Sequence, residues 1–251
     1  MRYSVILALL STAVFAQCTP PSYSVRIAAH GDSITVGADT PNHPYLEDLA
    51  ALITSSSVTV STLNGGTSGI SWKYAWPSSP NPNTMIQEAP TVIDPDLALS
   101  GYKEKWLILF AGTNGMNLAL GNHSAQTEYA NFEEYIAARR TAGWPMNRVI
   151  VCTMLPRGAG EEAARAAYNP MLVAGATQYK YRLARFDLDA NMGQAGQNSN
   201  TTYYLDGTHP TNAGQTILAG IIYQTMYGDT GNPQPKCGSA TLSGYSSGVI
   251  Q

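Results

Sequence analysis

Short runs of apolar residues alternate along the chain with longer stretches in which apolar residues recur at helical spacing. This alternation is typical of βαβ units, in which each strand of a parallel sheet is followed by a covering helix. The predicted strands are 24–29, 58–63, 105–112, 148–155 and 181–188. The predicted helices are 44–56, 125–143, 161–178 and 211–228. The pattern therefore predicts an α/β protein, a three-layer α/β/α sandwich around a five-stranded parallel sheet.

Details of these segments sharpen the prediction. The third and fourth strands, 105–112 and 148–155, are nearly continuous in apolar residues, as expected for strands that are covered on both faces. Pro170 is expected to kink or split the third helix, because it removes a backbone donor and clashes with the preceding turn. Thr211 and Gly228 are predicted to cap the two ends of the last helix.

The two ends of the chain differ from this pattern. Residues 1–16 combine Arg2 with an apolar run that ends in small residues, which predicts a secretory signal peptide cleaved after Ala16. The run is shorter than the roughly 20 residues needed to span a bilayer. Residues 229–251 form a tail rich in Gly, Ser and Pro. We therefore expect one domain over residues 17–228 of a secreted, extracellular protein that is a monomer and has no membrane span.

Charge and histidine spacing exclude several classes of function. The chain has a net charge of -3, and its Lys and Arg residues are spread out, so it has no basic track for a nucleic-acid backbone. His30, His43 and His123 do not stand at a spacing typical of metal ligands. We therefore expect no nucleic acid, no metal and no cofactor.

The three cysteines and two asparagines predict covalent modifications of an exported chain. Cys152 lies in an apolar run, where a free thiol behaves as a small buried hydrophobe. Cys18 and Cys237, near the two ends of the mature chain, are then the expected disulfide. Asn122 and Asn200 each begin an acceptor pattern for N-glycosylation, which predicts that both lie on surface loops.

Four polar segments follow predicted strands, at the edge of a parallel sheet where ligands bind. The first is 30–37, in which Ser33 comes directly after Gly31 and Asp32. A serine at the start of a helix either caps the first turn or exposes its hydroxyl beside free backbone N–H groups. This segment alone is compatible with both interpretations.

The next two segments contain hydrogen-bond donors. Residues 64–69 are rich in glycine, which lets backbone N–H groups approach a ligand closely. Residues 112–115 contain Asn114, whose side-chain amide is a neutral donor able to face developing negative charge. A flexible turn would explain the first segment equally well, and a structural asparagine the second.

The last segment, 206–210, places Asp206 three residues before His209. An acid at this spacing can fold back to accept the Nδ1–H of the imidazole, which leaves Nε2 free to take a proton. A histidine before a proline is also commonly an ordinary loop residue. Together, however, the four segments supply a nucleophile, two kinds of oxyanion donor, a base and an acid that orients it.

The four segments resemble the four blocks of the SGNH hydrolase superfamily, the GDSL-type esterases and lipases. The matching stretches are GDSIT at 31–35, NGGTSG at 64–69, GTN at 112–114 and DGTHP at 206–210. The resemblance implies a flavodoxin-like fold and an esterase in which Ser33 is the nucleophile, His209 the general base and Asp206 its orienting acid. It also implies an oxyanion hole formed by the backbone N–H groups of Ser33 and Gly69 and the side-chain amide of Asn114.

One residue departs from the family pattern. The third block often reads GTND, whereas residue 115 is glycine in this chain. The missing carboxylate leaves the bracing of the loop beside Asn114 unexplained, and it predicts more room in the pocket. It removes none of the reacting groups.

Aromatic residues beside the predicted oxyanion glycine suggest a substrate. Trp72, Tyr74 and Trp76 stand at alternate positions, and their flat faces with polar atoms suit sugar rings. Packing inside the domain is the competing interpretation. The resemblance to secreted carbohydrate esterases favours an acetylated plant polysaccharide such as acetylated xylan as the ester substrate. A lipase or general short-chain esterase, an acyltransferase and a non-catalytic carbohydrate-binding protein remain as alternatives.

Overall fold

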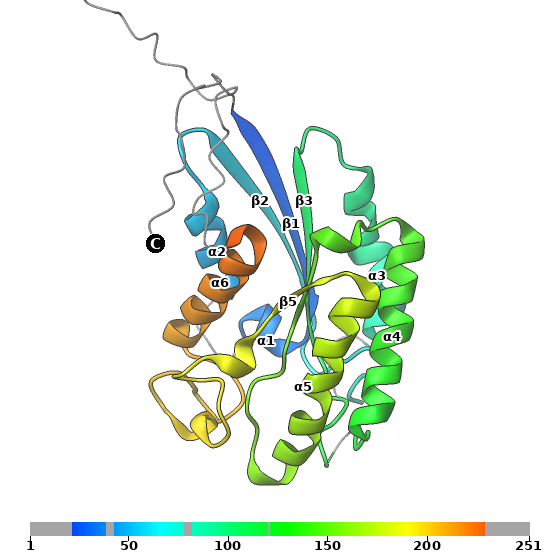
Figure 1. Ribbon diagram of the computed structural model, residues 1–251, viewed down its shortest axis with the longest axis vertical. Helices are drawn as coiled ribbons and strands as arrows, with labels where there is room; N and C mark the ends of the chain where they lie inside the picture. The colour runs from blue at the N-terminus through cyan, green and yellow to red at the C-terminus, as the bar shows by residue number, and fades with distance from the viewer. Residues whose placement is uncertain (1–21, 39–42, 78–81, 120, 229–251) are drawn as a thin grey trace, which may run out of the picture.

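Five parallel strands form one sheet at the centre of the molecule (Figure 1). The computed structural model describes residues 22–38, 43–77, 82–119 and 121–228. The strands are β1 (Tyr23–Gly31), β2 (Val58–Gly66), β3 (Glu104–Phe110), β4 (Val149–Cys152) and β5 (Arg182–Ala184). Their order in the sheet is β2-β1-β3-β4-β5, and every pair of neighbours is parallel. The predicted α/β/α fold with a five-stranded parallel sheet is confirmed.

Helices cover both faces of the sheet. The α-helices are α1 (Ser33–Val36), α2 (Tyr45–Ile53), α3 (Met85–Val92), α4 (Ala125–Ala142), α5 (Ala159–Tyr179) and α6 (Asn212–Tyr227). Short 3-10 helices are η1 (Asp94–Ala98), η2 (Met146–Arg148), η3 (Phe186–Leu188) and η4 (Gln197–Ser199). In Figure 1, α2 and α6 lie on one side of the sheet and α3, α4 and α5 lie on the other. The strands therefore run between two helical layers.

The central strand β3 shows why the sequences of the inner strands are continuous apolar runs. Trp106, Ile108 and Phe110 pack into the core shared with α2 and α6, while Leu107 and Leu109 pack into the core shared with α3, α4 and α5. Successive side chains of a strand point to opposite faces, so a strand covered on both sides buries every residue. All five side chains are fully buried.

The helix ends follow the sequence signals, with one exception. The Thr211 side chain accepts a hydrogen bond from the backbone N–H of Gly214 at 3.2 Å, and α6 ends before Gly228, as predicted. Pro170, in contrast, lies inside an uninterrupted α5, so of the two predicted effects, a kink or a split, the split is wrong. Pro170 and Ala166, whose carbonyl loses its helical partner, are both exposed, so water can satisfy the freed group.

The predicted covalent features are only partly within the described residues. Cys152 is a buried free thiol, as predicted, and burial raises its pKa well above the ordinary value. Cys18 and Cys237, the predicted signal peptide and the predicted tail lie outside the described residues. Asn122 is exposed in the loop before α4, and Asn200 is half-buried in a turn. No helix within the described ranges is long and apolar enough to cross a membrane.

Candidate active site

The tight turn between β1 and α1 places Ser33 at the carboxyl edge of the sheet. Asp32 is the N-cap of α1, and its Oδ1 accepts a hydrogen bond from the backbone N–H of Ile34 at 3.0 Å. Ser33 is therefore the first helical residue and not the cap, which leaves its hydroxyl free for another partner. Gly31 makes the turn possible, because a Cβ there would fall on the Thr35 side chain and the Phe110 carbonyl.

A chain of hydrogen bonds joins three of the predicted residues. Ser33 Oγ lies 2.9 Å from Nε2 of His209, and Nδ1 of the same ring lies 2.8 Å from Oδ2 of Asp206. Because Nδ1 faces a carboxylate, it carries the ring proton, and Nε2 accepts from the Ser33 hydroxyl. The structure thus brings together the first residue of α1 and a residue of the loop before α6, 176 positions apart in sequence.

Asp206 is held as a carboxylate by the loop that it belongs to. Its Oδ1 accepts the backbone N–H groups of Thr208 and His209, each at 2.8 Å. Burial on its own would raise the pKa of Asp206, but the hydrogen bonds from the backbone and side chain of His209 and from Thr208 outweigh it and lower the pKa. The charged form is the one that orients an imidazole and stabilises an imidazolium.

The two other predicted oxyanion donors lie in loops that are bonded to each other. Gly69 is buried in the loop after β2 with a φ of 82°, a conformation that glycine adopts without strain. The Asn114 amide, in the loop after β3, donates to the carbonyl of Ile70 at 2.9 Å. An amide nitrogen carries two hydrogens, so one remains for a ligand. Thr67 in turn donates its backbone N–H to the Gly31 carbonyl at 2.9 Å, which ties the Gly69 loop to the Ser33 turn.

A buried polar network supports the Gly69 loop from below. His30 is fully buried, with Nδ1 2.7 Å from the Tyr135 hydroxyl and Nε2 3.4 Å from the Glu88 carboxylate. The Thr67 hydroxyl donates to the same carboxylate at 3.4 Å. Burial lowers the pKa of His30, which keeps the ring neutral. The roles of Glu88 and Tyr135 could not be predicted from the sequence, because the neighbouring residues do not show whether a polar residue of a helix is buried or solvated.

Glycine at position 115 does not leave extra room, contrary to the sequence prediction. A Cβ built on Gly115 would fall on the carboxylate of Glu128, which reaches in from the first turn of α4. Both residues are buried. The space beside Asn114 is therefore already filled by an acid from another element.

Of the three aromatic residues after Gly69, one is a core residue. Trp72 is 1 % exposed, packs its ring against Phe132 and Tyr135, and donates its Nε1–H to the Tyr168 hydroxyl at 2.8 Å. The prediction that Trp72 binds substrate is therefore wrong, because its faces are covered by protein.

The other two aromatic residues lie closer to the surface. Tyr74 and Trp76 are both half-buried. The Tyr74 ring makes an edge contact with His123, and Trp76 lies against Gly69, where a Cβ would meet it at 3.3 Å. Their predicted contact with substrate stays a prediction.

A hollow of about 400 Å³ adjoins Asp206 at the same edge of the sheet. Three of its lining residues are glycines and one, Leu118, is apolar. The remaining lining residues are Asn117, Arg157, Glu161, Asn198, Asp206 and Thr208. Arg157 is 8 % exposed and donates from Nε to Glu161 at 3.0 Å. The side chains that line the hollow are therefore mostly polar.

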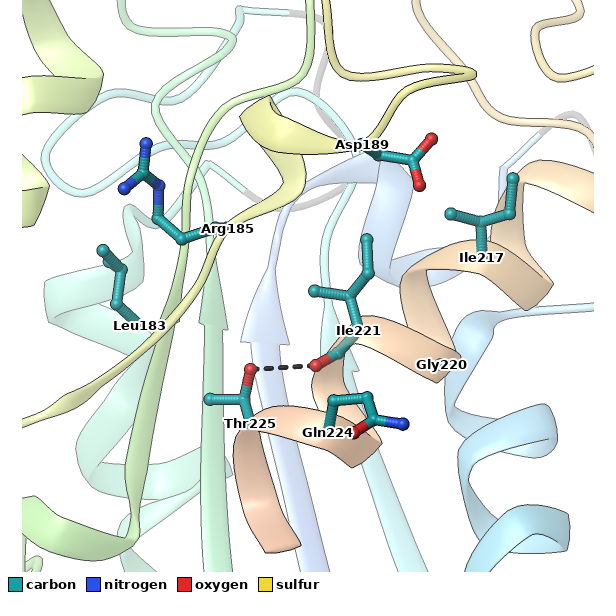
Figure 2. A pocket seen from close by; sticks show the side chains of 8 residues that line it. All are labelled: Leu183, Arg185, Asp189, Ile217, Gly220, Ile221, Gln224 and Thr225. Atoms are coloured by element: carbon teal, nitrogen blue, oxygen red, sulfur yellow. Dashed lines mark hydrogen bonds between the residues drawn. The ribbon is translucent and has the colours of Figure 1, made fainter. Parts of the chain in front are cut away.

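A second hollow, of about 520 Å³, lies away from these residues between β5 and α6 (Figure 2). Figure 2 shows Leu183 on β5 and Arg185 just after it on one side of the hollow, and Ile217, Ile221 and Thr225 along α6 on the other. None of the candidate site residues lines it. Within the described ranges, no group of three or more His, Cys, Asp or Glu side chains is arranged to hold a metal ion.

A parallel sheet that carries a hydrogen-bonded serine, histidine and aspartate at its carboxyl edge is typical of serine hydrolases. The sequence profile of the GDSL-like lipase/acylhydrolase family matches residues 29–217, and the chain belongs to this family. The protein is a carboxylic ester hydrolase, and the resemblance to SGNH hydrolases is confirmed.

Solved structures of similar fold include three esterases or lipolytic proteins. A lipolytic protein of the G-D-S-L family from Veillonella parvula is 19 % identical (80 % of this chain, 97 % of that chain, TM-score 0.59). An aryl esterase from M. smegmatis is 18 % identical (79 % and 96 %, TM-score 0.61). A carbohydrate acetylesterase from Sinorhizobium meliloti is 15 % identical (80 % and 97 %, TM-score 0.62). These likenesses establish the shared fold. A search of curated proteins found no match to the chain.

Proposed function

We propose that this hydrolase is a secreted serine esterase that removes acetyl groups from a plant polysaccharide such as acetylated xylan. The observation that carries the catalytic part is the hydrogen-bonded chain from Ser33 through His209 to Asp206. The proposed secretion rests on the signal pattern of residues 1–16.

In the proposed mechanism, Ser33 Oγ attacks the ester carbonyl carbon while its proton passes to Nε2 of His209. The backbone N–H groups of Ser33 and Gly69 and the Asn114 amide stabilise the resulting oxyanion. Cleavage of the C–O bond releases the sugar hydroxyl, which takes the proton from His209, and leaves an acetyl-enzyme. Water then attacks this ester, His209 takes its proton and returns it to Ser33, and acetate leaves.

The polar hollow beside Asp206 favours a carbohydrate over a lipid. Its donors and acceptors suit the hydroxyl groups of a sugar, whereas an acyl chain would bury them without partners. It holds two carboxylates, Glu161 and Asp206, against the single guanidinium of Arg157, so a neutral ligand fits better than an anion. The half-buried rings of Tyr74 and Trp76 offer further contacts for sugars, and one protein of similar fold is described as a carbohydrate acetylesterase.

The experiment that tests the proposal is acetate release from acetylated xylan by the wild type and the Ser33→Ala variant. Hydrolysis of p-nitrophenyl acetate and p-nitrophenyl octanoate is measured in parallel. We expect acetate from xylan and a preference for the acetyl ester, both abolished in the variant. Strong octanoate hydrolysis without acetate from xylan would instead indicate a lipase or general esterase. Transfer of acetyl groups to an added sugar, seen by product analysis, would indicate an acyltransferase, and sugar binding without turnover would indicate a binding protein.

The pH dependence tests the role of His209 separately. A general base accepts a proton only in its neutral form, so kcat/KM is expected to fall at acidic pH. The measurement is kcat/KM for p-nitrophenyl acetate across the range of pH from about 5 to 8, where histidine side chains change charge. A flat profile over that range would contradict a histidine base.

A further inference from the structure

Glu128 is a fully buried carboxylate in the first turn of α4, outside the set of proposed reacting groups. Burying a carboxylate costs several kcal/mol unless hydrogen bonds satisfy its oxygens. Such a group at the edge of an active site therefore needs an explanation beyond the packing of its helix.

The hydrogen bonds of Glu128 reach the two loops that carry the oxyanion donors. Its Oε1 accepts a hydrogen bond from the hydroxyl of Ser71, two residues after Gly69. Its Oε2 lies 2.8 Å from Nδ1 of His123, and this hydrogen bond raises the pKa of the His123 ring. Asn131, one turn along α4, also donates to Oε2, at 3.5 Å. One carboxylate thus holds the loop after β2 and the segment before α4 together.

The contact through His123 extends to the residue beside Asn114. The backbone N–H of His123 donates to the Gly115 carbonyl at 2.8 Å. The Glu128 carboxylate itself lies where a side chain on Gly115 would begin. The connection through Ser71 is equally short, because Asn114 donates to the carbonyl of Ile70, the residue between Gly69 and Ser71.

We propose that Glu128 is the positioning residue of the oxyanion hole, a carboxylate supplied from α4 in place of one at position 115. It fixes the Gly69 loop through Ser71 and the Asn114 loop through His123 and Gly115. Oxyanion donors act only when they are held at the correct place, and an error of about 1 Å can cost roughly a hundredfold in rate. The inference rests on the proposed roles of Ser33, Gly69 and Asn114.

The direct test is Glu128→Gln, measured with p-nitrophenyl acetate. Glutamine nearly keeps the shape, but its amide has one acceptor oxygen and cannot accept from both Ser71 and His123. We expect kcat to fall about ten- to a hundredfold with a much smaller change in KM, because the lost contacts act in the transition state. The matched control is Glu134→Gln, an exposed glutamate of the same helix that pairs with Lys73, and its kcat should stay at the wild-type value.

A double-mutant cycle separates positioning from general loosening of the fold. If Glu128 acts through the oxyanion donors, Glu128→Gln should lower kcat by a smaller factor in an Asn114→Ala background than in the wild type, because only the Gly69 donor is then left for it to position. An equal loss in both backgrounds would overturn the inference, and so would a Glu128→Gln variant with wild-type kcat. If Glu128→Gln does not fold, Ser71→Ala, which removes one of the two contacts, replaces it in the same cycle.

Rescue supplies the positive evidence. Gly115→Asp alone should lose activity, because the new side chain collides with the Glu128 carboxylate. Gly115→Asp combined with Glu128→Ala returns a carboxylate to the same space, and we expect a kcat at least about fivefold above that of Glu128→Ala. If the double variant has no higher kcat than Glu128→Ala, the idea that the Glu128 carboxylate replaces one at position 115 is contradicted. Wild-type hydrolysis that does not depend on Ser33 would instead reject the proposed function, before any Glu128 variant is measured.

Discussion

Two adjacent residues at the start of α1 have different roles: Asp32 caps the helix, and Ser33 is the proposed nucleophile. The capping is done by Oδ1 of Asp32, so the serine hydroxyl does not have to hold the helix. The other oxygen of Asp32, Oδ2, is buried without a hydrogen-bond partner among the described residues. Burial raises the pKa of Asp32 to about 6, with the capping hydrogen bond and the charges of His209 and Arg157 opposing the rise. The turn that presents the nucleophile therefore contains a carboxylate that is costly to ionise.

This cost predicts a pH-dependent stability. A carboxyl with a pKa near 6 in the folded state and about 3.9 in the unfolded state stabilises the fold below pH 4, and the contribution is lost as the pH rises through 6. Asp32→Asn keeps a capping oxygen but does not titrate. We expect the unfolding free energy of the wild type, relative to this variant, to decrease by up to about 3 kcal/mol between pH 4 and 7. Urea unfolding at several pH values measures it, and parallel pH profiles would contradict the prediction.

The proposed role of Asn114 predicts that loss of its side-chain amide strongly lowers kcat. Asn114→Ala removes one oxyanion donor, which is expected to lower kcat about 10²- to 10³-fold. The lost bond to the Ile70 carbonyl should lower the unfolding free energy by only about 1 kcal/mol, so the variant still folds. Steady-state kinetics with p-nitrophenyl acetate and thermal unfolding measure the two effects. Asn147→Ala, an exposed asparagine before β4, is the control, and near-normal turnover in Asn114→Ala would refute the role.

At the scale of elements, strands and long helices could be predicted because their patterns reflect burial directly. The continuous run of β3 and the caps of α6 are examples. Helix α3 was missed, because it is short and contains Pro90, and the predicted split of α5 ignored how well an exposed proline is tolerated. Both errors concern features that depend on tertiary packing and solvent exposure, which the local sequence does not determine.

The residues of the candidate site also fall into two groups, those that could be predicted from the sequence and those that could not. Ser33, Asn114, Asp206 and His209 stand in short motifs directly after strands, so the topology alone predicts that they meet. Glu128 could not be predicted, because a glutamate in the first turn of an amphipathic helix is usually a solvated residue at the positive end of the helix dipole. Its burial follows from the absence of a side chain at position 115, thirteen residues earlier in the chain.

The segment after Gly69 turns back on itself, which separates its aromatic residues. A bridge between Ile70 and Ala75 forms a short loop, and Trp72 at its turn points into the core. Trp72→Phe should lower the unfolding free energy by about 1–3 kcal/mol, because it leaves the Tyr168 hydroxyl unpaired. Tyr74→Ala should leave stability nearly unchanged and raise the KM for acetylated xylan. Unfolding curves and xylan kinetics on both variants check this, and the opposite pattern would contradict the assignment.

At the scale of the whole molecule, the single sheet brings loops from both halves of the chain to one edge. The Ser33 turn follows β1 near the middle of the sheet, and the loop with Asp206 and His209 precedes α6, whose packing on α2 fixes its position. The Gly69 and Asn114 loops follow β2 and β3, the two neighbours of β1. The candidate site is therefore a property of the fold, and no single segment contains it.

The predicted export is testable on the intact protein. Expressed in a eukaryotic secretory host, the mature chain should begin at Gln17, and Asn122 and Asn200 are the positions where sugar is expected. After denaturation without reductant, a thiol titration is expected to find one free cysteine, Cys152, if Cys18 and Cys237 form the predicted disulfide. Mass spectrometry of the secreted chain gives the first residue and the glycans. Retention of residues 1–16, or three free thiols, would reject the corresponding prediction.

The buried thiol on β4 has a further use. Cys152 lies inside the sheet between β3 and β5, and its raised pKa leaves almost none of it as the reactive thiolate. An alkylating reagent therefore reaches it only when the strands around it separate. The rate of Cys152 alkylation in native conditions then measures how often the strands at the centre of the molecule separate. Cys152 is therefore a natural probe of the unfolding rate.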